Sequence, residues 1–248
     1  MNEGIGKTIK LFLLWCFLYV APLLIGFPVC RFFLNRMDHG IMCWLMVLGS
    51  LLIVAVFFGK RYVRPSFGRI ERRMVWPVVG MSVLIAAALL FVEGSVGELF
   101  FYEKLHEMDE DSQVISGIGG ILYGCIFGPI AEEIGFRGVL LGGLLKTRCR
   151  PWVAILISAI AFGLLHRFPL AFFGSIVFGI IVGWMYWRTS SIIPGIIAHI
   201  ANNSLTGIDP TGWNHSVFPI ILAVSLLLLA YCLGWFGKSV CVQEGENH

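Results

Sequence analysis

Long uncharged apolar runs alternate with short polar segments along nearly the whole chain. A run of about 20 apolar residues is the length that an α-helix needs to cross a bilayer. The strands of a membrane β-barrel instead show alternation over about 10 residues, which these runs lack. Eight runs stand out, over residues 11–30, 40–59, 74–92, 114–145, 151–165, 169–187, 190–206 and 217–236. The pattern predicts an all-α polytopic membrane protein with about eight transmembrane helices.

The composition excludes a soluble globular protein. Of the 248 residues, 58% are hydrophobic and only 13% are charged, whereas soluble domains average about 25% charged residues. A net charge of +3 gives no reason to expect a nucleic-acid partner. The longest polar stretch is an acidic loop that begins at Glu93 and is too short to form a separate domain. We therefore expect a single membrane domain over residues 1–248.

The basic residues are distributed unevenly between alternate loops. If the N-terminus is cytoplasmic, 13 of the 18 Lys and Arg residues fall on the cytoplasmic side and four on the other, while Arg137 lies inside a run. The acidic stretch from Glu93 to Asp111 then falls on the outer side. Cytoplasmic loops of membrane proteins carry an excess of Lys and Arg. We therefore expect both termini in the cytoplasm and a location in the cytoplasmic (plasma) membrane.

The fourth run holds charged residues where they are costly. Glu132 and Glu133 are adjacent in its middle, and Arg137 follows. Ionisable residues in a membrane segment cost roughly 2.5–3.5 kcal/mol each and are functional-site candidates by default. Glu133 and Arg137 have the i,i+4 spacing of a pair along one helix face, whereas Glu132 points about 100° away. An ion pair that fixes helix packing would leave Glu132 without a purpose, which favours Glu132 as a general base or acid.

Two further polar groups lie at a similar depth. His166 ends the fifth run, and His199 and Asn203 share one face of the seventh run at i,i+4 spacing. A lone histidine at the end of a span is more often an interfacial residue than a catalyst. At about 1.5 Å per helical residue, however, these three residues and Glu132 all lie roughly 16–24 Å from the inner boundary. The shared depth predicts one polar layer between the fourth, fifth and seventh spans.

The residue types in this layer favour the activation of water. Glu132 would deprotonate a water molecule, and His166 would hold that water or relay its proton. His199 and Asn203 would donate hydrogen bonds to the oxyanion of a tetrahedral intermediate. Zinc bound by the glutamate and the two histidines is the alternative. Because the sequence lacks an HExxH motif and asparagine is a poor zinc ligand, we expect no metal and no other cofactor.

Three motifs follow one another in a specific order: Glu132-Glu133-x-x-x-Arg137, Phe162-x-x-x-His166 and His199-x-x-x-Asn203. Together they resemble the CPBP family, which contains the type II CAAX prenyl proteases and the bacteriocin-processing (Abi) intramembrane endopeptidases. The resemblance covers a catalytic core over residues 114–210. It implies a polytopic helical fold and hydrolysis of a peptide bond in a membrane-tethered protein or peptide.

The same resemblance implies a role for each motif residue. Glu132 is expected to be the catalytic glutamate and His166 its assistant, while His199 and Asn203 form the oxyanion hole. Glu133, Arg137 and Phe162 are expected to support the site. Many relatives are labelled metalloproteases, so that mechanism stays open beside the glutamate mechanism.

Two other classes of function fit the same residues. A proton-coupled transporter could use the glutamates and histidines as a relay. A membrane immunity or scaffold protein could keep the motifs without activity. Turnover separates the classes, because a protease cleaves its peptide in detergent whereas a transporter needs a sealed bilayer.

Overall fold

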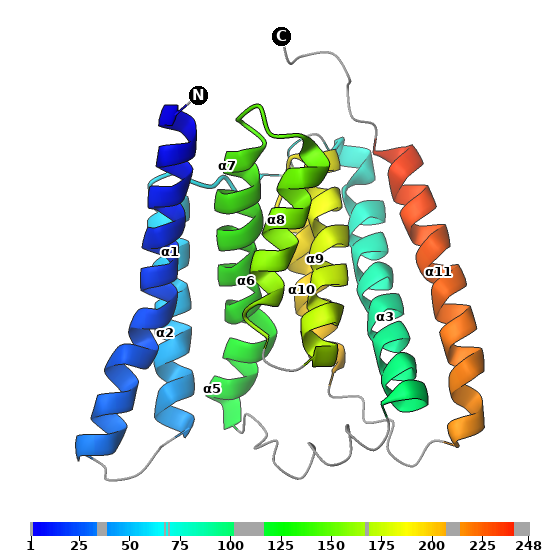
Figure 1. Ribbon diagram of the computed structural model, residues 1–248, viewed down its shortest axis with the longest axis horizontal. Helices are drawn as coiled ribbons and strands as arrows, with labels where there is room; N and C mark the ends of the chain where they lie inside the picture. The colour runs from blue at the N-terminus through cyan, green and yellow to red at the C-terminus, as the bar shows by residue number, and fades with distance from the viewer. Residues whose placement is uncertain are drawn as a thin grey trace.

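The computed structural model describes residues 2–33, 39–66, 68, 70–101, 117–166, 169–206 and 214–240. All regular secondary structure in these ranges is helical. The helices form eight rods that run alternately in opposite directions through one bundle (Figure 1). The prediction of an all-α polytopic membrane protein is confirmed.

Five rods are long and apolar enough to cross a membrane. Each contains a long apolar window, so lipid is the solvent that suits them. They are α1 (Asn2–Pro28) with the π-helical η1 (Val29–Phe33), α2 (His39–Gly59), the 3₁₀ turn η2 (Arg72–Met74) with α3 (Val75–Phe100), α9 (Pro169–Thr189), and the 3₁₀ turn η5 (His215–Val217) with α11 (Phe218–Ser239).

The other three rods are short or irregular. The fourth rod is built from five pieces: α5 (Gly117–Leu122), the π-helical η3 (Tyr123–Phe127), α6 (Gly128–Glu133), the π-helical η4 (Ile134–Leu141) and α7 (Gly142–Leu144). Two 13-residue helices complete the set, α8 (Pro151–Gly163) and α10 (Ile193–Leu205), and each begins with a proline in its first turn. Short π-helical segments inside helices occur frequently at functional sites.

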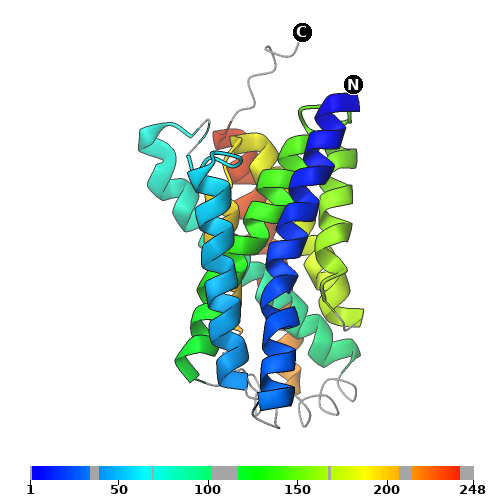
Figure 2. The same cartoon turned by 90° about the vertical axis from the view of Figure 1, so that its left-hand side faces the viewer.

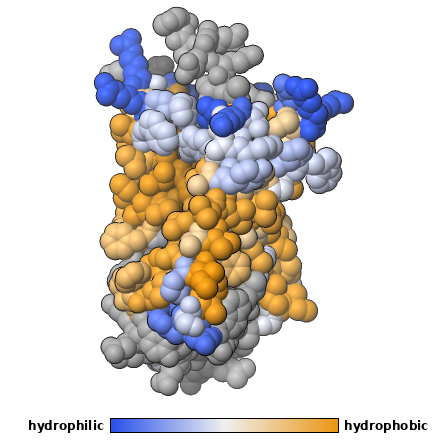
Figure 3. Space-filling view, turned by 90° about the vertical axis from the view of Figure 1, so that its right-hand side faces the viewer, coloured by the Kyte–Doolittle hydropathy of each residue, from blue (hydrophilic) through white to orange (hydrophobic). Residues whose placement is uncertain are grey.

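The surface of the bundle matches a membrane environment. On the face shown in Figure 3, an apolar belt covers the middle of the bundle, with polar residues above and below it. Many large apolar side chains are exposed on the outer rods, among them Leu13, Phe17, Leu48 and Leu227. Exposed apolar area on this scale marks a contact surface, and the belt assigns that surface to lipid. The start of α1 and the end of α11 lie at the same end of the bundle (Figure 1).

Glycines let the other rods approach the fourth rod closely. A methyl group at Gly135 would lie 2.2 Å from the indole of Trp15, and one at Gly143 would lie 2.3 Å from the Thr8 hydroxyl. Both partners belong to α1, which itself packs beside α2 (Figure 2). The indole nitrogen of Trp15 also donates a hydrogen bond to the backbone oxygen of Ala131, at 2.8 Å. These contacts fix α1 against the pieces of the fourth rod that carry the charged residues.

The third rod departs from the expected boundaries. The charge of Glu93 suggested that the span ends at residue 92, but α3 continues to Phe100. Glu93 and Glu98 therefore lie on a helix of the bundle and not in an outer loop. The rest of the expected acidic loop, up to Asp111, falls outside the described residues.

Candidate active site

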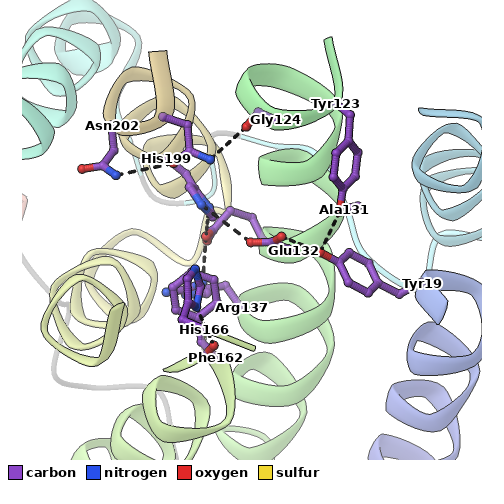
Figure 4. Close-up of polar contacts among 12 residues, drawn as sticks. Tyr19, Tyr123, Gly124, Ala131, Glu132, Arg137, Phe162, His166, His199 and Asn202 are labelled. Carbon is purple, nitrogen blue, oxygen red and sulfur yellow. Dashed lines mark hydrogen bonds and ion pairs between the residues drawn. The ribbon is translucent and has the colours of Figure 1, made fainter. Parts of the chain in front are cut away.

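Three rods carry the residues of the sequence motifs, and the close-up in Figure 4 shows most of them. Glu132 and Glu133 end α6, and Arg137 follows in η4. Phe162 lies at the end of α8, with His166 just beyond that helix. The remaining two motif residues, His199 and Asn203, lie on α10.

Glu133 is the centre of a fully buried polar cluster. Its Oε1 atom accepts a hydrogen bond from Arg137 Nη1 at 2.7 Å and another from the Nδ1–H of His199 at 3.0 Å. The Glu133 and Arg137 side chains are both 0% exposed. A methyl group at Gly195 would lie 2.8 Å from Glu133 Oε2, so α10 can approach the carboxylate only because residue 195 is a glycine. The cluster therefore ties α10 to the fourth rod through one carboxylate.

Glu132 has different partners, because the helical turn of about 100° per residue points it away from Glu133. Its Oε1 atom accepts a hydrogen bond of 2.6 Å from the Tyr19 hydroxyl of α1. Its Oε2 atom lies 3.7 Å from His199 Nε2. The Glu132 side chain remains 15% exposed, and no arginine or lysine pairs with it among the described residues.

His199 connects the two glutamates. Its Nδ1 atom contacts Glu133 and its Nε2 atom faces Glu132. The imidazole ring also packs between aromatic rings, with centroid distances of 5.5 Å to Phe162 and 5.1 Å to Phe178 of α9. Since the ring is hydrogen-bonded at Nδ1 and packed against two aromatic rings, its Nε2 atom has a fixed direction.

Phe162 braces the cluster from the side of α8. The Arg137 guanidinium lies 4.6 Å from the centroid of the Phe162 ring, a geometry in which the ring quadrupole attracts the cation. His166 packs against the same ring at 5.0 Å, and its Nδ1 atom lies 3.3 Å from the Phe162 backbone oxygen. Phe162 thus contacts three of the polar motif residues.

Asn203 is anchored to the fourth rod. Its Nδ2 atom donates a hydrogen bond to the Gly124 backbone oxygen at 2.9 Å, and its Oδ1 atom lies 3.4 Å from Asn202 Nδ2. An amide nitrogen carries two N–H groups, so the bond to Gly124 leaves one of them for another acceptor. The anchor orients that second N–H group.

A cavity of about 240 Å³ joins the motif residues of α8 and α10. Its wall includes His166, His199 and Asn203, but it does not include Glu132, whose Oε2 atom lies 3.7 Å from His199. The structure thus brings His199 directly to both glutamates, whereas His166 and Asn203 reach the site through the shared cavity. The rest of the wall is Leu89, Val92, Glu93, Val96, Phe162, Phe173, Gly174, Ser175, Val177, Phe178 and Asn202.

The cavity wall contains the carboxylate of Glu93, which the sequence pattern predicts in an outer loop. Glu93 of α3 lies on this wall, so Glu132 and Glu133 are not the only carboxylates near the polar layer. The prediction that Glu93 lies in an outer loop is therefore wrong. The physical reason is that a cavity inside the bundle accepts a carboxylate that lipid would exclude.

Sequence reasoning also missed the aromatic residues that hold Glu132. Tyr19 donates to Glu132, and the Tyr123 hydroxyl lies 3.1 Å from the Tyr19 hydroxyl. Trp15, one turn before Tyr19, stacks on its ring at 4.9 Å. Trp15 and Tyr19 are spaced i,i+4 and therefore share one face of the first span. Because aromatic residues are common in membrane helices, this spacing alone does not identify them as site residues.

Among the described residues, no three His, Cys, Asp or Glu side chains gather in a group that could hold a metal ion. Glu132 and His199 approach each other, but His166 lies on another part of the cavity wall.

The matches to known proteins fall on the same part of the chain. Residues 115–205 match the family model described as type II CAAX prenyl endopeptidase Rce1-like. The chain is also similar to "Putative membrane peptidase YdiL" of Bacillus subtilis (strain 168), with 30% identity over 136 residues. That match covers 51% of this chain and 55% of the relative, so the chain spans about half the length of the curated relative. No solved structure matches.

The Rce1-like match runs from just before α5 to the end of α10. It therefore contains all three ordered motifs and every contact among their side chains, whereas Tyr19 and Glu93 lie outside it. Residues 115–205, which carry the three motifs, are therefore similar to the type II CAAX prenyl endopeptidases of the Rce1-like family model.

Proposed function

We propose that this protein is a CAAX-protease-like membrane endopeptidase that hydrolyses a peptide bond in a membrane-tethered protein or peptide. One observation carries the proposal. Glu132, oriented by Tyr19 at 2.6 Å, and His199, oriented by Glu133 at 3.0 Å, face each other across 3.7 Å beside a cavity. This distance is too long for a hydrogen bond, so both groups keep the capacity to contact a third atom.

In the proposed mechanism, Glu132 is the general base. It takes a proton from water, and the resulting hydroxide attacks the carbonyl carbon of the scissile peptide bond. When the tetrahedral intermediate collapses, the C–N bond breaks and Glu132 returns the proton to the leaving amine. Within the described chain no lysine or arginine pairs with Glu132, and its side chain is 15% exposed, both of which support this role. His166, on the cavity wall, would hold the water molecule.

The oxyanion is assigned to His199 and Asn203. Because His199 gives its Nδ1–H to Glu133, it donates from Nε2 only as the imidazolium. Asn203 would donate its second N–H group, since the first is bound to Gly124. Preorganised donors of this kind act most strongly in a site that excludes bulk water.

The direct test is cleavage of acylated peptides by the purified protein in detergent. We expect cleavage that persists in phenanthroline, because Glu132 and His199 alone do not form a zinc site. Loss of cleavage in phenanthroline, with recovery on added zinc, would establish the metalloprotease mechanism instead. A complete lack of cleavage across a broad peptide panel, by protein that is folded and monodisperse, would refute the proposed function.

A proton-coupled transporter is the second candidate. The observation in its favour is a continuous polar chain from Tyr123 through Tyr19, Glu132 and His199 to Glu133, with contacts of 2.6–3.7 Å. Such chains relay protons in membrane proteins. Proton flux in sealed liposomes, together with no cleavage in detergent, would favour the transporter.

We also infer that both termini face the cytoplasm and that the protein resides in the plasma membrane. The support is the excess of Lys and Arg on the loops at one end, where α1 starts and α11 ends (Figure 1). Reporter fusions test this orientation. A fusion at Ser66 should read inside and one at Glu107 outside, and identical readings would overturn the orientation.

A further inference from the structure

Among the residues that line the cavity beside the polar layer, Glu93 is the carboxylate, and the polar side chains of His166, His199, Asn202, Asn203 and Ser175 share the wall. Glu93 projects from α3, where Leu89, Val92 and Val96 are its neighbours on the wall. Phe173 and Val177 of α9 add further apolar surface. A cavity with an apolar wall and a few polar groups is the usual form of a binding pocket, in which the polar groups set orientation and specificity.

The Glu93 carboxylate lies against the backbone of α9. A methyl group at Gly174 would lie 2.4 Å from Glu93 Oε1 and 2.9 Å from Glu93 Oε2. The glycine therefore provides the room for the carboxylate. Among the described residues, no hydrogen bond or ion pair reaches this carboxylate.

The charges around the cavity are unbalanced. Glu132 and Glu133 contact His199 of the wall, and Glu133 also binds one guanidinium, whereas no ion pair reaches Glu93 within the described residues. That guanidinium belongs to Arg137, which is fully buried and already paired with Glu133. A carboxylate in a poorly solvated site costs free energy unless a cation accompanies it. A cation that enters with the substrate would supply that partner.

We propose that Glu93 forms a specificity subsite that binds a lysine or arginine side chain of the peptide substrate. The inference rests on the proposed endopeptidase function and names its substrate class, peptides with a basic residue near the scissile bond. The apolar wall suits the methylene stem of such a side chain, while the charged head reaches the carboxylate. A volume of about 240 Å³ is below the roughly 300–1,000 Å³ of pockets for drug-sized ligands. The cavity therefore fits one or two side chains.

The test uses acylated peptides of one length that differ at a single position. A lysine is moved through the positions on each side of the scissile bond, and at each position its counterpart is norleucine, which keeps the stem and removes the charge. We expect the unaltered protein to cleave peptides with lysine at one position about 10- to 100-fold faster in kcat/KM. This factor corresponds to one charge-assisted hydrogen bond.

The variant Glu93→Gln keeps the size and hydrogen-bonding capacity of the side chain but removes its charge. It should cleave lysine and norleucine peptides equally. The matched control is Glu98→Gln, on the same helix but outside the cavity wall, and it should keep the lysine preference. Equal cleavage of both peptides by the unaltered protein would overturn the proposal without any variant. A preference that survives in Glu93→Gln would overturn it as well.

A binding measurement separates this inference from the proposed function. In Glu132→Gln protein, which should hold peptides uncut, fluorescence anisotropy should show tighter binding of the lysine peptide than of the norleucine peptide. The double variant Glu132→Gln, Glu93→Gln should lose that difference. Charge-selective binding without cleavage by the unaltered protein would support the subsite and refute the endopeptidase. Cleavage without charge selectivity would support the endopeptidase and refute the subsite.

Discussion

The two faces of α6 place neighbouring carboxylates in different surroundings. Glu133 is fully buried and receives Arg137 and His199 on one oxygen, whereas Glu132 is partly exposed and receives only the neutral Tyr19 hydroxyl. The first arrangement stabilises a charge and positions a histidine. The second orients a carboxylate without neutralising it. The comparison teaches that a single helical step can separate a structural carboxylate from one suited to take a proton.

The largest effect is expected from removing the base on the partly exposed face. Glu132→Gln keeps the volume and the hydrogen bond to Tyr19 but cannot accept a proton from water, so hydrolysis should fall to background. Peptide cleavage by purified protein measures the effect, and size-exclusion chromatography shows whether the fold is kept. The exposed Glu71→Gln variant is the matched control and should keep full activity. Near-normal cleavage by Glu132→Gln would show that another carboxylate is the base.

Removing the cation from the buried face should damage both fold and activity. Arg137→Ala leaves the Glu133 charge without its partner in a site that is 0% exposed, which typically costs about 3–5 kcal/mol. A thermal unfolding curve in detergent should shift strongly downwards, and cleavage should fall as well. The double variant with Glu133→Gln should recover part of the stability, because no charge is then left uncompensated. Unchanged stability in the single Arg137→Ala variant would show that the Glu133 charge does not depend on Arg137. The contrast drawn between the two faces of α6 would then be wrong.

Asn203 tests whether the anchored amide on α10 serves the reaction. Asn203→Ala should lower kcat by roughly 10²–10³, or about 2.7–4 kcal/mol, as the loss of one oxyanion donor does. Because its other N–H group only joins α10 to Gly124, stability should fall less than in Arg137→Ala. Asn202→Ala, the neighbouring change on the cavity wall, should have a smaller effect on kcat. An equal loss in both variants would argue against an oxyanion donor at residue 203.

The smallest effect is expected from the hydroxyl that orients Glu132. Tyr19→Phe removes the 2.6 Å hydrogen bond and keeps the ring stacked on Trp15. The loss of one such bond to a charged group is worth roughly 1.5–3 kcal/mol, so kcat should fall about 10- to 100-fold with little change in KM. Tyr231→Phe, on the lipid-exposed surface of α11, is the matched control. An unchanged kcat in Tyr19→Phe would mean that the Glu132 carboxylate is held by other contacts.

Local spacing was sufficient to predict the buried face of the site. The i,i+4 pair of Glu133 and Arg137 is confirmed by the 2.7 Å contact, because that geometry depends only on helical repeat. The eight rods also follow from hydropathy, since membrane helices must be apolar over their length. The expected catalytic roles of Glu132, His166, His199 and Asn203 stay predictions.

Long-range contacts could not be predicted in the same way. Tyr19 is 113 residues away from Glu132 along the chain, and nothing in its apolar helix distinguishes it from other aromatic residues. Glu93 was placed in a loop because a charge usually ends an apolar run. In the folded bundle, Gly174 and the cavity provide room for it inside a helix. The contact of Tyr19 and the position of Glu93 both depend on how the rods pack against one another, and the order of residues along the sequence does not reveal that packing.

The length of α8 has a consequence for the surrounding membrane. Its 13 residues rise only about 20 Å, against a hydrocarbon core of about 30 Å. Its outer face is nevertheless apolar and exposed, with Trp152, Leu156 and Ile160 pointing away from the bundle. Such hydrophobic mismatch is relieved when the adjacent bilayer thins. The lipids beside Phe162 and His166 should therefore be compressed, which shortens the path from bulk water to the polar layer and makes the site sensitive to bilayer thickness.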